Sequence, residues 1–423
     1  MSSLGPLKDG GNVAIIGGAP AGAGCALALL RMASDMGRRI HVTIIERKEF
    51  AGELDHNQCL GVLSPPLPSL LKHDLNLPFP SHLSRGEIHE YIVHGEKEKL
   101  SLDADDYPSV ALRRVQFDEY MLNAARERGA KILRARAVDL EFQDQGVVIE
   151  TDHTPVEADV VVGAFGLEES SATMFEVNSR YRKPKALESV VTKYHPGDKV
   201  MDDFGLRIHA FLPTQLRIEF GAITPKGNHL SIIIAGQSVD ADLMKAFLRH
   251  PNSHKELANL ELAGRIDSND LDFYTGRFPR SIARDYYGDR YVMAGDAAGL
   301  VRAFKGKGVT AAVQTGIRAA NVILKKGISK QAFHTYYRKE NIETIRDLPY
   351  SRLMRLVTIG LERSRMIDPI LRAAKTEPRL QEALYDAVSG RATSRHVWAN
   401  GLSARSLTSI ARSLLGRSKR KSC

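Results

Sequence analysis

Cysteine is scarce in this chain, which has only Cys25, Cys59 and Cys423 among its 423 residues. The three lie far apart and form no CxxC pair, so the sequence predicts neither a disulfide framework nor a zinc site, and we expect no metal. Unpaired thiols in such small number are typical of a reducing compartment, which favours a cytoplasmic location.

Long uncharged runs are nearly absent as well. Residues 12–30 form the one stretch that approaches the roughly 20 residues needed to cross a membrane. Glycines interrupt this stretch, and no basic leader with a small-residue cleavage site precedes it. We therefore expect a protein without a membrane span or a secretory signal.

Acidic residues are missing from the end of the chain, since none follows Asp386, whereas residues 387–423 hold eight lysines and arginines. The whole chain has a net charge of +9, so the remainder is close to neutral, which disfavours nucleic-acid binding across the surface. Within the basic C-terminal segment, apolar residues recur at helical spacing, with Arg405 and Arg412 on the opposite side. Two hypotheses stay open for residues 402–421: peripheral contact with an anionic membrane, or an ordinary helix packed on the body.

A glycine-rich turn follows a short apolar segment near the start of the chain. Residues 13–16 predict a strand, and helix-forming residues continue from 20 to 36. Such a strand, turn and helix direct unpaired backbone N–H groups and the positive end of the helix dipole at a pyrophosphate. The turn positions that we expect to bind a dinucleotide are Gly17, Ala19, Pro20, Ala21 and Gly22, with Ala19 where a third glycine is usual.

An acidic residue ends the next predicted strand, residues 41–45. The spacing from Gly22 to Glu46 is close to the roughly 20 residues typical of an acid that accepts hydrogen bonds from a ribose. We therefore predict that Glu46, with Arg47 beside it, contacts the ribose. A 2′-phosphate is disfavoured by this acid, so the nucleotide in this first site should not be NADP.

A second cofactor segment lies far downstream. Residues 290–294 predict a strand that leads into Gly295 and Asp296, and a turn of Gly306, Lys307 and Gly308 opens a helix that continues to about Leu324. Together with residues 13–22 and Glu46, this segment resembles the FAD-binding flavoproteins of the p-hydroxybenzoate hydroxylase fold, and within them most of all the geranylgeranyl reductase family.

The resemblance implies FAD as the cofactor. It places Asp296 on the ribityl chain and the N-terminus of the later helix opposite N1 and the C2 carbonyl of the flavin, where a helix dipole stabilises negative charge. Lys305 and Lys307 either add to that positive field or are merely solvated. Arg114 would lie near the cofactor, the alternative being a salt bridge with Asp118, and the backbone of Val138 would hold the adenine.

The predicted fold is α/β: a Rossmann-type FAD-binding domain with an inserted antiparallel-sheet substrate domain and a C-terminal helical extension. Residues 215–237 read as two strands of the inserted sheet. The predicted domains are the first part of the FAD-binding domain at 1–180, with about 75–105 as a candidate part of the substrate domain, the substrate domain at 181–275, the second part of the FAD-binding domain at 276–330, and the helical region at 331–423.

Catalytic residues are much less clear than cofactor ligands. Cys59 and Gly61 match a Cys-x-Gly segment that the geranylgeranyl reductases have beside the flavin. Cys59 is therefore a candidate proton donor, the alternative being a lining residue. Lys305 and Lys307 are the other catalytic candidates, and the catalytic acid stays unassigned.

Three functions stay open. The first, favoured by the resemblance, is a reductase of carbon–carbon double bonds in an isoprenoid or other hydrophobic substrate, with NAD(P)H or a reduced carrier as the electron donor. The second is a monooxygenase or halogenase of a small aromatic or polyketide. Phe165 stands where related hydroxylases have an acid, and Trp398 is the only tryptophan, so no Trp-x-Trp halogenase segment exists. The third is an FAD-binding sensor or docking protein without turnover.

Overall fold

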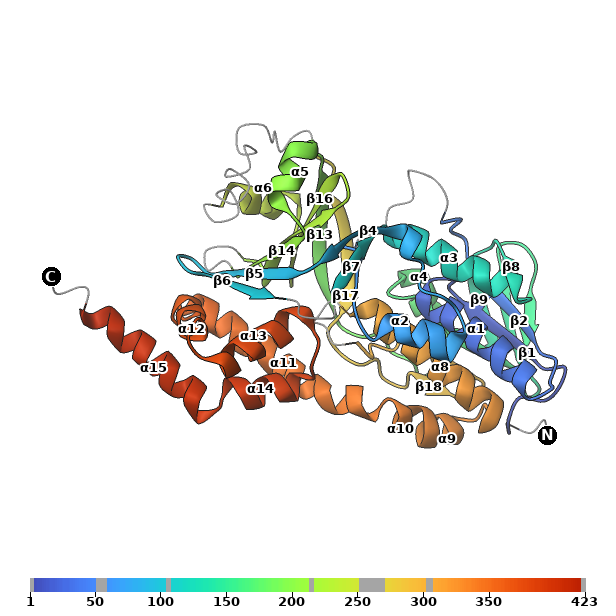
Figure 1. Ribbon diagram of the computed structural model, residues 1–423. Coiled ribbons are helices and arrows are strands. Elements are labelled where there is room, and N and C mark those ends of the chain that lie inside the picture. Colours follow the sequence, from blue (N-terminus) through green and yellow to red (C-terminus); the bar gives the residue numbers. More distant parts are fainter. Residues whose placement is uncertain are drawn as a thin grey trace.

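The computed structural model describes residues 4–50, 59–103, 108–212, 217–250, 271–301 and 307–419, with side chains up to residue 415. Figure 1 shows three parts: a nucleotide-binding part that holds the N-terminus, a strongly bent sheet beside it, and a group of C-terminal helices that runs beneath both. This arrangement confirms the predicted α/β fold with an inserted sheet and a helical extension.

The nucleotide-binding part is built on a six-stranded sheet, whose strands pair in parallel apart from the edge strand β18. Helices cover the sheet, so its inner strands are almost wholly apolar. In spatial order its strands are β18 (Tyr287–Gly288), β19 (Tyr291–Met293), β12 (Val160–Gly163), β1 (Asn12–Ile16), β2 (His41–Ile45) and β8 (Lys131–Leu133).

Two of the covering helices cross unusually closely. These are α1 (Pro20–Asp35) and α8 (Gly308–Lys325), and α3 (Arg114–Glu127) also packs on α1. A Cβ on Gly316 would lie 2.3 Å from the carbonyl oxygen of Ala21, so only glycine allows this crossing. Cys25 is buried at the same contact, and burial raises its pKa to about 12, which makes it a structural cysteine.

Two three-stranded antiparallel sheets complete this part of the chain. The first sheet contains Val138, and the second sheet contains the short strand that follows Cys59. The elements are β9 (Ala137–Phe142), β10 (Val147–Thr151), β11 (Val156–Ala158), β3 (Val62–Leu63), β7 (Ser109–Leu112), β4 (Ser84–Ile88), α2 (Leu67–Ser69), α4 (Glu169–Asn178), a π-helix at Leu70–Asp74 and 3-10 helices at Ser81–Leu83 and Gly295–Ala297.

The inserted sheet has seven strands and is antiparallel except for the parallel pair of β14 and β5. The helices α5 (Asp198–Phe204) and α6 (Ala241–Arg249) pack on one face, and the other face turns toward the C-terminal helices. Two strands of this sheet come from the segment 75–105. In spatial order the strands are β17 (Tyr274–Pro279), β13 (Ala186–Tyr194), β16 (His229–Gly236), β15 (Phe220–Lys226), β14 (Arg207–Phe211), β5 (Glu90–His94) and β6 (Lys99–Asp103).

The C-terminal helices pack against the inner face of this sheet, with Ile367 and Leu371 in its apolar cluster. A buried ion pair between Arg355 and Glu219 adds a polar link, with Nε of the arginine 2.5 Å from the carboxylate. No helix in the described ranges is both long and apolar enough to cross a membrane. The elements are α9 (Lys330–Ala332), a π-helix at Phe333–Tyr337, α10 (Arg338–Glu340), α11 (Ile342–Arg363), α12 (Ile367–Ala374), α13 (Pro378–Ser389), α14 (Ser394–Gly401) and α15 (Ala404–Lys419).

Candidate functional site

The N-terminus of α1 is open toward a large cavity. The N-cap residue is Ala19, whose side chain cannot accept hydrogen bonds from the N–H groups of the first turn. Pro20 follows as the first helical residue. Ala19 has φ −71° and ψ −177°, an ordinary extended conformation, so an alanine in the place of the usual glycine causes no backbone strain. A Cβ on Gly22 would lie 1.9 Å from the carbonyl oxygen of Gly17, which explains the glycine there.

Glu46 lies beside this turn, as predicted for a ribose ligand. Its Oε2 accepts a hydrogen bond from the Gly18 N–H at 2.7 Å, and its Oε1 accepts one from the Lys48 N–H at 2.8 Å. Each carboxylate oxygen has a further lone pair, so the two backbone bonds orient the group and leave it able to accept from hydroxyls. Arg47 also lines the cavity.

Asp296 faces the cavity from the second cofactor segment. Gly295 before it has φ +63° and donates its N–H to Oγ1 of Thr315 at 2.8 Å, which fixes the turn. Burial raises the pKa of Asp296 to about 6, although the charge of Arg114 opposes this. A carboxylate with this little solvent is suited to accept hydrogen bonds from a bound hydroxyl-bearing ligand.

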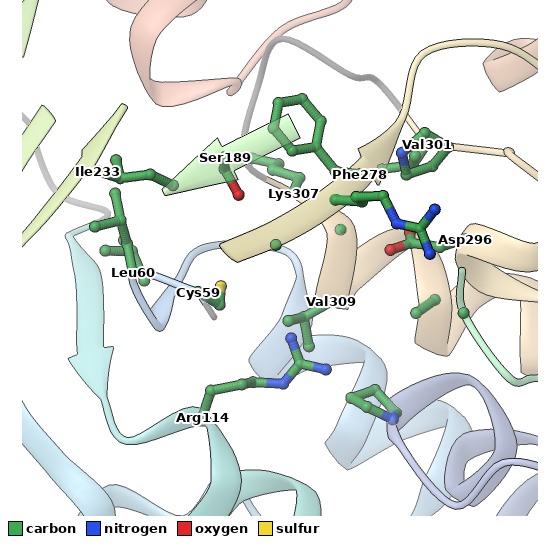
Figure 2. Close-up of a pocket in the computed structure, with 18 of the residues that line it drawn as sticks. Cys59, Leu60, Arg114, Ser189, Ile233, Phe278, Asp296, Val301, Lys307 and Val309 are labelled. Carbon is green, nitrogen blue, oxygen red and sulfur yellow. The ribbon is translucent and has the colours of Figure 1, made fainter. Parts of the chain in front are cut away.

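Arg114 makes the salt bridge that we considered as an alternative and also lines the cavity. Its Nε lies 2.6 Å from Oδ1 of Asp118, a buried carboxylate one turn later on α3. Figure 2 shows its guanidinium directed into the cavity, toward the same space as the thiol of Cys59 and the carboxylate of Asp296. The salt bridge therefore positions the arginine in the cavity wall.

Cys59 and Lys307 approach the cavity from opposite segments. Sγ of Cys59 accepts a hydrogen bond from the Gly61 N–H at 3.4 Å, and Nζ of Lys307 donates to the carbonyl oxygen of Pro65 at 2.8 Å. Lys307 is thus half-buried and bonded, and Gly308 next to it begins α8 on the cavity wall. Lys305 and Gly306 lie outside the described residues.

The side chain of Val138 does not line the cavity. It is 52% exposed, whereas its neighbours Ala135, Arg136 and Ala137 line the cavity wall. The predicted contact to the adenine was assigned to the backbone of Val138, so the exposed side chain does not test it.

Two residues of this region were missed by the sequence analysis. Thr315 holds Gly295, and nothing in the pattern of α8 marks it. Glu168 lines the cavity and caps α4, accepting hydrogen bonds from the backbone N–H groups of Ser170 and Ser171. Burial alone would raise the pKa of Glu168, but the hydrogen bonds have the larger effect and lower this pKa to about 2. The two acids before Ser170 were the available signal, since acidic residues are favoured near a helix N-terminus.

A group of possible metal ligands lies on α13 and α14, at Glu382, Asp386 and His396, where the three ligand atoms are within 4.8 Å of one another. Arg391 already pairs with this group, since its Nε is 2.8 Å from Oδ1 of Asp386 and its Nη2 is 3.3 Å from Oε1 of Glu382. The guanidinium thus pairs with both carboxylates, so an ion-pair network accounts for the group.

The cavity itself has a volume of about 720 Å³, in the upper part of the range typical of cofactor and ligand sites. One end holds the turn of α1, Glu46, Arg114 and Asp296, whose open N–H groups, acceptors and charge fit the pyrophosphate, ribose and ribityl groups of FAD. The other end, which we call the apolar chamber, is lined by Tyr91, Val93, Ile208, Phe220, Ala222, Ile233, Leu361, Ile367, Ile370, Leu384 and Val388.

Comparison with known proteins agrees with this geometry. Residues 14–168 match a model of FAD-NAD(P)-binding domains. Two digeranylgeranylglycerophospholipid reductases of Methanosphaera stadtmanae are 25% and 24% identical, over 50% and 60% of this chain and 53% and 66% of their own length. The chain therefore contains an FAD-NAD(P)-binding domain and is similar in sequence to these two reductases. It spans about half to two thirds of the length of these two relatives.

Solved structures show the same fold for this chain. A geranylgeranyl bacteriochlorophyll reductase-like protein from Thermoplasma acidophilum superposes with a TM-score of 0.69 at 15% identity, over 97% of this chain and 99% of that chain. A mutant of the halogenase PltM in complex with FAD superposes with a TM-score of 0.61 at 14% identity, over 98% and 92%. The fold is therefore shared by a reductase-like protein and a halogenase, and the predicted FAD agrees with the FAD-NAD(P)-binding model that residues 14–168 match.

Proposed function

We propose that this flavoprotein reduces carbon–carbon double bonds of an isoprenoid or another hydrophobic substrate. The observation that carries the proposal is the apolar chamber, which continues directly from the cofactor end of the cavity. Its walls come from the inner face of the seven-stranded sheet and from α11 to α13, so a long apolar molecule would be enclosed on both sides. Burial of such a molecule is favourable by about 25 cal/mol per Å² of apolar surface.

The chain's own residues have separate tasks in this proposal. Bound FAD supplies the hydride chemistry. The turn of α1 and Glu46 bind the nucleotide, Asp296 and Arg114 orient the cofactor, and the apolar chamber excludes water from the reacting carbon atoms. The thiol of Cys59 points into the cavity, which supports it as the group that holds the proton for the substrate (Figure 2).

The surroundings of Phe165 argue against the monooxygenase alternative. Its ring stacks on Phe175, with centroids 5.5 Å apart, and meets Tyr181 edge-on at 6.3 Å. An aromatic cluster therefore occupies the position where related hydroxylases have an acid. This favours the reductase among the flavin enzymes that share the fold.

The decisive experiment supplies the reduced flavoprotein with a prenyl substrate under anaerobic conditions and measures the product by mass spectrometry. We expect the substrate to gain two hydrogen atoms per double bond while the oxidised flavin spectrum returns. A hydroxylated or halogenated product formed only with oxygen would replace the proposal with a monooxygenase or halogenase. Flavin binding without any product would favour a sensor.

Two isoleucines of β16 give a matched test of the apolar chamber. Ile233 lines the chamber, whereas Ile232 is buried on the opposite face of the sheet, under α5 and α6. Ile233→Ala should raise the KM for a prenyl substrate about tenfold, because it removes apolar contact with the substrate. Ile232→Ala should lower stability and leave KM close to the wild-type value. Equal KM values for both variants would contradict the chamber as the substrate site.

We also propose that α15 contacts anionic membranes. This helix packs along α12 and its C-terminal end projects from the molecule (Figure 1). Leu407, Leu414 and Leu415 are exposed on it, with Leu415 at 71%. Arg405 and Arg412 are exposed as well. Each basic residue near an anionic lipid surface contributes about 1 kcal/mol to binding.

Part of the expected apolar face of α15 is used in packing, because Ile410 lies against the apolar cluster beneath α12 and α13. Liposome flotation of the full chain and of a chain that ends at Gly401 tests the contact that remains. We expect the full chain to float with anionic vesicles at low salt and the shortened chain to stay in the lower fraction. Equal behaviour of the two chains would reject the membrane contact.

A further inference from the structure

Basic residues continue the cavity-lining face of the seven-stranded sheet. On β16, His229 and Ser231 share a face with Ile233, which lines the apolar chamber, because alternate residues of a strand point the same way. Lys193 of β13 pairs with Ser231, and Lys226 of β15 pairs with His229. The same sheet face therefore changes from apolar to basic along its strands.

These residues gather with an arginine from the nucleotide-binding part. The rings of His195 and His229 have centroids 5.0 Å apart, and Arg113, the residue before α3, is close enough to lower the pKa of Lys193 in addition to burial. The group extends from the exposed His195 to the buried Lys226. We call Arg113, Lys193, His195, Lys226 and His229 the basic cluster.

The innermost members are buried without a carboxylate partner among the described residues. Lys226 is 5% exposed and His229 is 7% exposed, and within the described part of the chain no carboxylate pairs with any member of the basic cluster. Nε2 of His229 and Oγ1 of Thr224, one row away on β15, are also buried without a hydrogen-bond partner among the described residues. Burying an ammonium without an anion is costly, and burial lowers the pKa of Lys226 to about 8.

Gly61 connects the basic cluster to the catalytic cavity. A Cβ on Gly61 would lie 2.9 Å from Nζ of Lys226 and 2.1 Å from the carbonyl oxygen of Leu112, so the ammonium lies directly against this backbone. The N–H of the same glycine donates to Sγ of Cys59, which lines the cavity. The cluster and the cavity are therefore separated by one short backbone segment.

We propose that the basic cluster binds the oxyanion of a phosphate or carboxylate group, with Lys226 as its central ligand. An oxyanion would neutralise the charges of Lys226, Lys193 and Arg113, and it would accept a hydrogen bond from the Thr224 hydroxyl, which has no partner among the described residues. The group could belong to the substrate or be a free ion. The first source rests on the proposed function, because the substrate's apolar part would then occupy the adjoining chamber.

The test is calorimetric titration of the FAD-loaded protein with inorganic phosphate and with pyrophosphate at constant ionic strength. Bound FAD keeps the turn of α1 occupied, so the titration reports a different site. We expect Lys226→Met to weaken binding about tenfold or more, since it removes a charge-assisted hydrogen bond. The matched control is Lys199→Met, an exposed lysine on α5 across the sheet, which should bind like the wild type.

Several results would overturn the proposal: no binding by the wild type at millimolar phosphate or pyrophosphate, or equal affinities of the two lysine variants. Lys226→Met should melt no lower than the wild type without added oxyanion, because Lys226 is buried without a partner. Should it unfold nevertheless, Arg113→Gln must show the same loss of binding.

Competition between phosphate and a prenyl substrate identifies a substrate group, and independent binding identifies a free ion. Failure of double-bond reduction with intact phosphate binding would reject the proposed function alone.

Discussion

The surroundings of Asp296 disfavour the ionised form of its carboxyl group. Its pKa is raised from 3.8 to about 6, mainly by burial. The folded protein therefore binds this proton more tightly than the unfolded chain does, so the stabilising contribution is complete below about pH 4 and is lost as the pH rises through 6. At neutral pH the protein without FAD bears an unfavourable charge at the position where a ribityl hydroxyl is expected.

Asp296→Asn should therefore separate stability from cofactor binding. At pH 7.5 we expect the variant without FAD to be more stable, with about 3 kcal/mol as the upper limit for a pKa shift from 3.8 to about 6. At about pH 3 the gain should largely disappear, because the wild-type carboxyl is then mostly protonated in both states. FAD affinity should fall about tenfold, since a charged acceptor is lost. Urea denaturation at the two pH values and a flavin fluorescence titration measure these effects, and an equal gain in stability at both pH values would contradict the explanation.

Ala19 and Arg114 show what single residues in the sequence could and could not reveal. The third glycine that is usual in this motif is absent, and the extended backbone of Ala19 shows that this conformation does not require one. For Arg114 the sequence offered two alternatives, a salt bridge with Asp118 or a place near the cofactor. In the structure Arg114 makes this salt bridge and also lines the cavity. A side chain can satisfy a local partner and still face a ligand, and only coordinates show this.

At the scale of elements, the crossing of α1 and α8 places both cofactor segments. Each helix begins at the cavity, so their mutual distance determines how far the turn at Ala19 lies from Gly308. The contact depends on Gly316, where an added Cβ would also come within 2.9 Å of the Cys25 backbone nitrogen. A backbone cannot yield as a flexible side chain can, so a methyl group must push the helices apart.

Gly316→Ala should lower stability by about 1–3 kcal/mol through overpacking and should weaken FAD binding as the helix ends separate. The control is Gly360→Ala in α11, where a new Cβ meets nothing within 4 Å and where alanine should stabilise the helix by up to about 1 kcal/mol. Thermal unfolding and FAD titration of both variants give the comparison. A Gly316→Ala protein as stable as the wild type would show that the crossing is not tight.

The elements that sequence could predict are those with a local signal. The expected helix at 20–36 is observed as Pro20–Asp35, and the strand at 41–45 as His41–Ile45, because apolar periodicity and bounding glycines mark both. The partner of β5 is β14, which lies more than 100 residues later in the chain. No local pattern specifies such a pairing, so the membership of residues 75–105 could only be suggested. The hydrogen bond between Thr315 and Gly295 could not be predicted for the same reason.

At the scale of the whole molecule, the helical extension closes the apolar chamber. Leu361, Leu384 and Val388 form a wall opposite the sheet, and the ion pair of Arg355 with Glu219 fixes α11 there. The sequence predicted helices in this region and gave a candidate role only to the basic tail, since the family resemblance is weak beyond residue 330. A wall built from helices of one part and strands of another depends on how the parts dock, which periodicity does not encode.

The docked extension also contains a buried acid, Glu362, next to this ion pair. Its Oε1 has no hydrogen-bond partner among the described residues, and burial, followed by the charge of Glu219, raises its pKa to about 8. The raised pKa means that the folded protein retains this proton when the unfolded chain has lost it. The stabilising contribution is therefore complete below about pH 4.5 and is lost progressively as the pH rises to 8.

Glu362→Gln removes this titration while keeping the shape of the side chain. We expect the variant to exceed the wild type in stability by a few kcal/mol (about 2–4) at pH 8.5 and to match it at pH 4.5, where both side chains are neutral. Because Glu362 follows Leu361 of the chamber wall, the gain should appear as slower proteolysis of the helical extension at pH 8.5. Glu343→Gln, a substitution at the start of the same helix, is the control and should show no such pH dependence. If Glu362→Gln destabilised the protein at pH 8.5, the ionised carboxylate would have to be a favourable partner of Arg355, and the extension would be held by a three-group ion network.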